Sequence, residues 1–121
     1  MDHPIPALPY VLDIATHLQA QPQQSVRTLL QTVDGINLVL WQIPPGASLP
    51  PHRHPHGTDI WFVLQGSAEL LDDAQSHRTV HAGHIVLIGR HQCHGVRNTA
   101  QQDCVLVSVI PVSAGFEALS H

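Results

Sequence analysis

Apolar, largely β-branched residues recur along this chain in short runs that are separated by Gly, Asp, Asn or Pro. Many short strands with marked turns and no long helical pattern are typical of an all-β sandwich or barrel. The runs at 25–33 and 36–43 flank Asp34-Gly35, and these two residues tolerate the positive φ of a tight hairpin turn. Further strands are expected at 59–65, 67–72, 77–82, 84–89, 94–98 and 104–111.

Several of these runs, such as 60–64 and 104–110, are apolar at successive positions, so both of their faces need cover. Two packed sheets cover one face of each strand. A further layer would come from the proline-rich first 24 residues or from a partner chain, so we expect a homodimer.

The pattern therefore divides the chain into three parts: an N-terminal arm at 1–24, a barrel at 25–112 and a tail at 113–121. Within the arm, the segment 8–14 has the residues of a strand. The tail is expected to form a last helical turn.

Length and charge narrow the class of protein. A chain of 121 residues with 43% hydrophobic residues fits one domain with one core. The net charge is −4, and the five basic residues are arginines scattered along the sequence, which argues against a nucleic-acid or membrane-surface partner. No basic segment followed by an apolar run opens the chain, so we expect a cytoplasmic location. Cys93 and Cys104 are too few for a disulfide framework and are expected to be structural thiols.

Histidine is the compositional outlier, at 11 residues. His52 and His54 lie two positions apart, which places both imidazoles on one face of a strand, where they can bind one metal ion. Asp59 lies an odd number of residues away, so a regular strand would point it to the opposite face. Pro55 and Gly57 interrupt that regularity, so the chain can turn and bring the carboxylate to the pair.

Two segments carry a spacing that resembles a known family. The first reads G(x)5HxH(x)4D(x)6G from Gly46 to Gly66, and the second reads G(x)5GxH(x)2H(x)3N from Gly83 to Asn98. Residues 67–82 separate them. Both segments resemble the two motifs of the cupin superfamily, which implies a single-domain double-stranded β-helix, or jelly-roll barrel.

The resemblance also implies a site for a divalent transition metal inside the barrel. Its protein ligands would be His52, His54, His94 and the carboxylate of Asp59, a set that suits Fe, Ni, Mn, Cu or Zn. Asp59 stands where the family pattern has Glu, so it would bind the metal directly, through water, or not at all.

The second motif departs from the family at two positions, with Gly89 in place of proline and His91 in place of glycine. The extra imidazole of His91 is expected at the mouth of the barrel. His91 and His56 are rim residues and the candidate general bases, because an imidazole titrates near neutral pH. The substrate pocket is expected to be small and mainly apolar, with an arginine at its entrance; its residues are Trp61, Val63, Arg90, Val96 and Leu106.

Two functions fit these residues. The first is a metal-dependent enzyme for a small molecule, of the dioxygenase, isomerase, decarboxylase or lyase type that similar family members represent. The second is a non-catalytic protein that binds a metal or a small ligand as a sensor, store or carrier. The fold itself does not choose between them.

Overall fold

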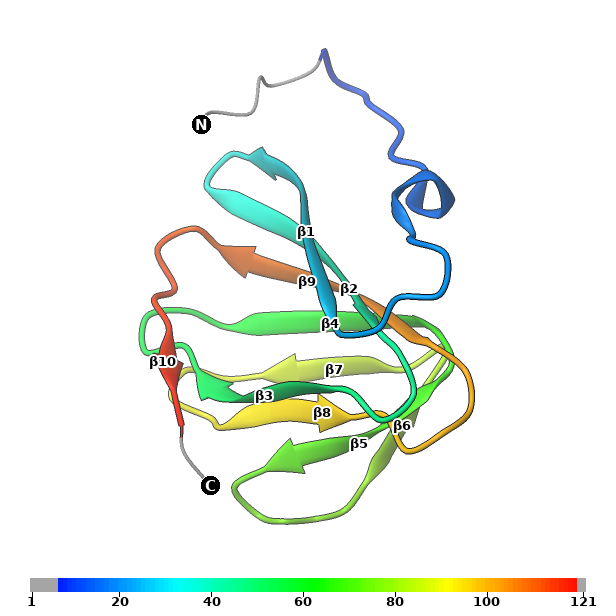
Figure 1. Cartoon of the computed structure of the whole chain (residues 1–121). Helices are drawn as coiled ribbons and strands as arrows, with labels where there is room; N and C mark the ends of the chain where they lie inside the picture. The colour runs from blue at the N-terminus through cyan, green and yellow to red at the C-terminus, as the bar shows by residue number, and fades with distance from the viewer. Residues whose placement is uncertain (1–6, 120–121) are drawn as a thin grey trace.

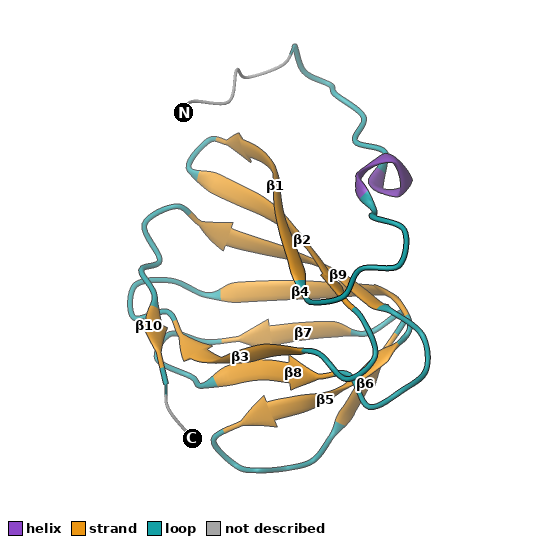
Figure 2. Ribbon diagram, viewed as in Figure 1, coloured by secondary structure: helices purple, strands orange, loops and turns teal. Residues whose placement is uncertain are grey.

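A computed structural model describes residues 7–119 as two five-stranded antiparallel sheets packed face to face (Figures 1 and 2). Sheet A has the order β1 (Val26–Val33), β2 (Ile36–Ile43), β9 (Cys104–Pro111), β4 (Asp59–Gln65) and β7 (Ile85–Ile88). Sheet B has the order β10 (Glu117–Ala118), β3 (Ser48–Arg53), β8 (His94–Arg97), β5 (Ser67–Asp72) and β6 (Thr79–His81). The predicted all-β jelly roll is confirmed.

The strands form where the apolar runs predict them. β2, β4, β5 and β9 coincide with the expected ranges, and the other strands predicted for the barrel differ by one or two residues at their ends. Asp34 and Gly35 have φ values of 51° and 75°, which is the left-handed backbone that a two-residue hairpin turn requires.

The main core lies between the sheets, and a smaller cluster lies on the outer face of sheet A. The outer cluster is built on Leu30, Leu40 and Val105, and side chains of the N-terminal arm, including Leu12 and Ile14, pack against it. The expected arm therefore covers part of sheet A in its own chain, and Figure 1 shows it beside β1 and β2.

The arm contains no strand between residues 8 and 14, contrary to the expectation. Its ordered element is a 3-10 helix, Ile14–His17, which begins where the Asp13 carboxylate accepts a hydrogen bond from the Ala15 backbone N–H. Positions 1–6 of the predicted arm lie outside the described residues.

The tail expectation was also wrong. No helical turn forms within residues 113–119, where the chain instead adds β10 to the edge of sheet B. Gly115 has a φ of 75°, which redirects the chain, and Glu117 forms an ion pair with Arg53 of β3. Residues 120 and 121 of the predicted tail lie outside the described residues. Within residues 7–119, no helix is long and apolar enough to cross a bilayer.

Two motif glycines provide a matched test of the fold. At Gly66, with φ of 72°, a Cβ atom would lie 2.2 Å from the backbone oxygen of Asp103, whereas at Gly83, with φ of 94°, no atom lies within 4 Å. Both replacements by alanine strain the backbone, by about 1–2 kcal/mol, but only the first forces a neighbouring strand to move. Gly66→Ala should lower the free energy of unfolding by about 2 kcal/mol more than Gly83→Ala in urea titrations. Equal losses would contradict this account.

Candidate metal centre

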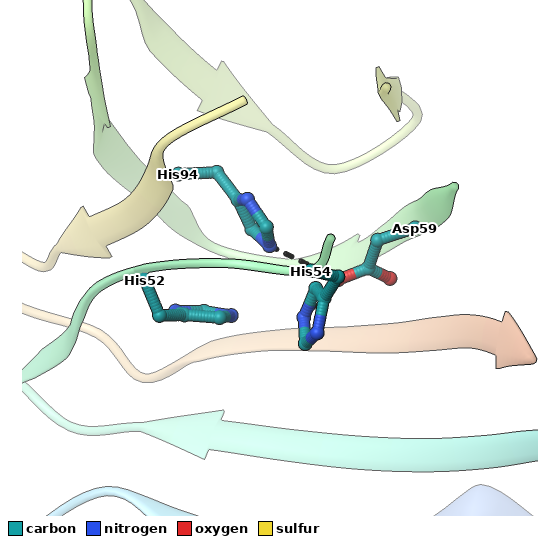
Figure 3. A group of neighbouring side chains, drawn as sticks. All are labelled: His52, His54, Asp59 and His94. Atoms are coloured by element: carbon teal, nitrogen blue, oxygen red, sulfur yellow. Dashed lines mark ion pairs between the residues drawn. The ribbon is translucent and has the colours of Figure 1, made fainter. Parts of the chain in front are cut away.

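Four side chains from both sheets converge at one point inside the barrel (Figure 3). His52 lies in β3, His54 directly follows β3, and His94 opens β8 as the register partner of His52, so sheet B supplies the three imidazoles. Asp59 opens β4 of sheet A. One ligand atom of each residue lies within 4.8 Å of the others.

The turn that brings Asp59 to the histidines is a crossing between the sheets. After β3 the chain leaves sheet B at residue 54, and it enters sheet A at residue 59. Because the inner faces of the two sheets oppose each other, the carboxylate meets the imidazoles from the other side of the barrel. The odd offset in sequence from His54 to Asp59 therefore does not decide which way the carboxylate points, because the two residues do not share a strand.

All three imidazoles are oriented by the backbone. The Nδ1 atom of His52 lies 2.8 Å from the Pro50 carbonyl, that of His94 lies 2.8 Å from the Gln92 carbonyl, and that of His54 lies 2.5 Å from the Gly115 carbonyl. A carbonyl oxygen can only accept, so each Nδ1 carries a proton, and Nε2 is the ring atom left to bind a metal ion. Metal-binding histidines commonly donate their other ring N–H to a carbonyl or carboxylate in this way.

Asp59 is buried, with 3% of its surface exposed, and both of its oxygens accept hydrogen bonds. Trp61 Nε1 donates to Oδ2 at 3.0 Å, and the Ser108 hydroxyl donates to Oδ1 at 2.5 Å. Oδ2 lies 3.3 Å from Nε2 of His94 and 3.6 Å from Nε2 of His54. The aspartate therefore reaches the histidines, although its side chain is one methylene shorter than the glutamate of the family pattern.

The donor set fits a divalent metal. His94 Nε2 is buried and has no hydrogen-bond partner among residues 7–119, and it points toward Asp59 and the other two rings. A buried acceptor without a partner is unfavourable by about 1–3 kcal/mol, and a metal ion would satisfy it. Three neutral imidazoles and one carboxylate suit Fe, Ni, Mn, Cu or Zn.

The cluster opens into a cavity of about 700 Å³. Its wall is mainly apolar and comes from β1, β2, β3, the start of β4, the end of β9 and the segment that follows β9. Phe116 stacks on the His52 ring with the centroids 5.3 Å apart, so the chain's last described segment forms part of the wall beside the cluster. This volume is typical of a cavity for a small organic molecule.

The cavity differs from the pocket that the sequence predicts. Trp61 lines it, as expected. Val63, Val96 and Leu106 do not line it and belong to the core between the sheets, because they lie deeper along strands whose inner faces are fully packed. Arg90 is exposed in the turn before β8 and does not line it either.

The two candidate bases lie on turns that flank the cluster. His56 is exposed, and its backbone N–H donates to the Ala114 carbonyl. His91 is exposed, has a φ of 65°, and its backbone N–H donates to the His54 carbonyl. Neither side chain lines the cavity, so their catalytic roles stay predictions.

Sequence reasoning missed the residues that support the cluster from a distance. Ser108 is the one polar residue in the apolar run of β9, and a hydroxyl within such a run is the sequence sign of a buried polar contact. The tail residues Gly115 and Phe116 gave no such sign, since their contacts with His54 and His52 arise only when the tail returns to β3.

Burial lowers the pKa of His52 from 6.5 to about 4, and the nearby His94 and His54 add to the effect, against the Pro50 hydrogen bond and Asp59. The unfolded chain would take up this proton near pH 6.5, whereas the folded chain takes it up near pH 4. The contribution of neutral His52 to the free energy of unfolding is therefore fully present above pH 6.5. It is lost as the pH drops from 6.5 to 4, which lowers the free energy of unfolding by about 3 kcal/mol.

This loss can be measured by urea unfolding of EDTA-treated protein between neutral and acidic pH. His52→Asn should reduce the steepness of the pH dependence. His77→Asn, at an exposed site, should keep it. Identical profiles for the wild type and His52→Asn would refute the assignment.

Comparisons with known proteins agree with this geometry. A family model described as the cupin domain matches residues 39–110. Germin-like protein 5-1 from Oryza sativa subsp. japonica is 27% identical over 78 residues, which cover 61% of this chain and 35% of that protein. This chain thus matches only about a third of the length of such curated relatives.

Two solved structures extend the comparison. A conserved uncharacterised protein with a double-stranded β-helix domain from Klebsiella pneumoniae subsp. pneumoniae has a TM-score of 0.84 and 27% identity, covering 92% of this chain and 97% of that one. Polyketide cyclase RemF from Streptomyces resistomycificus has a TM-score of 0.71 and 25% identity, covering 82% and 73%. Since the family model matches more than half of its residues, the chain belongs to the cupin family.

Proposed function

We propose that this cupin is a metal-dependent enzyme that acts on a small molecule at His52, His54, His94 and Asp59. The observation that carries the proposal is the convergence of these four side chains beside a cavity of about 700 Å³, whose wall includes His52, His54 and Asp59. A purely structural metal site is normally closed by its protein ligands, whereas a catalytic site faces the space that the substrate occupies.

A divalent metal bound there would supply a Lewis acid that polarises an oxygen of the substrate. The chain's own residues do the remaining work. Backbone carbonyls hold the imidazoles in one tautomer, and Trp61 and Ser108 hold the Asp59 carboxylate. The mainly apolar wall lowers the local dielectric constant, which strengthens the polar contacts beside it.

The reaction class that we propose is the one indicated by the family resemblance: dioxygenase, isomerase, decarboxylase or lyase. The likeness to a polyketide cyclase supports a substrate with an apolar body. His56 and His91 remain the candidate proton carriers, and either would have to reach the cavity from its turn.

A second function, in which the protein binds a metal or a small ligand without turnover, is supported by the placement of those two histidines. No imidazole beyond the cluster itself lines the described cavity, so a free general base is absent from its wall. Such a protein would act as a sensor, store or carrier.

The metal site can be tested by elemental analysis of the full chain. The wild type should hold about one metal ion per chain, and His94→Gln should bind it at least tenfold more weakly, since it removes the buried Nε2 atom. His77→Gln, which changes an exposed histidine bound to Glu69, should keep the wild-type metal content. Circular dichroism would verify that both variants fold. Full metal retention by folded His94→Gln would contradict the site.

The choice between enzyme and binding protein depends on turnover. The metal-loaded protein should consume oxygen or convert substrate with at least one member of a panel of β-diketones, thiols and catechols. In His94→Gln this activity should disappear while the fold remains. Tight stoichiometric metal with no activity across the panel would favour the binding function instead.

We also propose that two copies associate through the outer face of β4 and β7. Phe62 and Ile85 are register partners there, and with Leu64 and Leu87 they form an apolar patch that the arm leaves uncovered. Leu87 is 72% exposed, and β7 is an edge strand with one neighbour, so a second copy could cover both the patch and the edge.

Sedimentation measures this association directly. The wild type should sediment as a dimer, and Leu87→Arg should sediment as a monomer because it places a charge in the patch. Ile36→Arg, at an exposed apolar position of the β1–β2 hairpin, should remain a dimer. A monomeric wild type would exclude the interface.

A further inference from the structure

Arg27 lines the same cavity as the metal cluster, at a distance from it. It lies on β1, the edge strand of sheet A, and its register partner is Trp41 of β2, which also lines the cavity. Cross-strand partners project to the same face, so the Arg27 side chain shares the inner face of sheet A with Trp41.

The Arg27 side chain is exposed at the edge of sheet A and has no hydrogen-bond or ion-pair partner among residues 7–119. Arg53 and Arg78 form ion pairs with Glu117 and Asp72, but no hydrogen bond or ion pair engages Arg27 within residues 7–119. Arg27 is also the only Lys or Arg among the described residues of the cavity wall. An unpaired guanidinium beside an apolar cavity is a binding group for a carboxylate, which it holds with two parallel hydrogen bonds.

The strand register places Arg27 and Asp59 at opposite ends of the cavity. Asp59 opens β4, and the register through β9 aligns it with Asn37 of β2. Arg27 of β1 is instead paired with Trp41, further along β2. The two Cα atoms are therefore separated by three strand spacings of about 4.8 Å and by about 13 Å along the strands. Even after the arginine side chain extends inward, an elongated gap remains.

The wall between these two ends is apolar. Val39, Trp41 and Ile110 occupy the inner face of sheet A there, and Phe116 and Leu49 lie on the side of sheet B. A small dianion such as a dicarboxylate would fill little of this volume and could not contact both ends. The cavity thus fits a molecule with an apolar body and polar groups at both ends.

We propose that Arg27 is a specificity-determining residue that binds the carboxylate of an elongated apolar organic acid. The opposite end of that acid lies at the metal centre and carries the oxygen atoms that react there. This proposal rests on the proposed function, since it names the substrate class of the same site. Arg27 selects the acid and sets its orientation, while His52, His54, His94 and Asp59 hold the metal.

The test compares an acid with its neutral amide. Phenylhexanoic acid and phenylhexanamide have the same apolar body, and their affinities for the full chain can be measured by calorimetry at neutral pH. EDTA-treated protein is used first, so that the carboxylate cannot bind a metal ion. The wild type should bind the acid at least tenfold more tightly than the amide.

Arg27→Gln should reduce that preference to less than twofold without changing the affinity for the amide, which shows that the cavity is intact. Arg27→Lys should keep part of the preference. Arg97→Gln, which removes an exposed arginine of β8 outside the cavity wall, should behave as the wild type. A preference that survives in Arg27→Gln, or an acid that binds no better than its amide, would overturn the proposal.

A third probe tests the orientation. The same acid with a catechol in place of the phenyl ring should bind more tightly to the metal-loaded chain than to the EDTA-treated chain, and Arg27→Gln should weaken both. No gain on metal loading would exclude the proposed orientation. Failure of the metal site would appear separately, as absent metal in the wild type with the Arg27 preference retained.

Discussion

The structure depends on one buried electrostatic arrangement, in which a carboxylate of sheet A faces three imidazoles of sheet B. A buried charge is unfavourable unless hydrogen bonds or an opposite charge compensate it. Asp59 receives hydrogen bonds from Trp61 and Ser108, and both donors belong to sheet A. The sheet therefore fixes the carboxylate by itself, and the distance to the imidazoles is set by how the two sheets pack.

The imidazoles are fixed by hydrogen bonds to backbone carbonyls. Each Nδ1 is held by a carbonyl close to it in space, and two of these carbonyls, of Pro50 and Gln92, lie two residues before the histidine that they orient. The third belongs to Gly115 in the tail. The orientation of His54 thus requires β10 to pair with β3, which makes the tail part of the site. This hydrogen bond therefore couples the geometry of the site to the position of the tail at the edge of sheet B.

Most of the fold and the identity of the clustered residues could be predicted from the sequence, because both depend on patterns of residues that are close together in the chain. Strand ends follow from apolar runs bounded by Gly, Asp and Pro, and the cluster follows from two spaced motifs. Contacts between segments far apart in the chain leave no such local pattern, so the sequence does not predict them. The tail is expected to form a helical turn from its sequence, and only its pairing with Arg53 and His52 of β3 makes it a strand.

The same limit explains the pocket residues. Val63 and Leu106 are inward-facing and apolar, as a pocket wall would be, yet they fill the core. The sequence does not show how far along a strand the core ends and the cavity begins. That boundary depends on where the opposite sheet stops supplying side chains, which is a property of the packed sheets.

The position of the cavity follows from the open side of the barrel. β1 ends sheet A and β10 ends sheet B, and the described strands include no pairing between these two edges. The cavity is lined from both edges, by Arg27 on one side and by residues of the segment 114–119 on the other. Arg27 on the β1 edge can change without disturbing the buried cluster, because it takes no part in the contacts that hold Asp59 or the three imidazoles. The fold can therefore keep one metal centre while its edges determine which molecule reaches it.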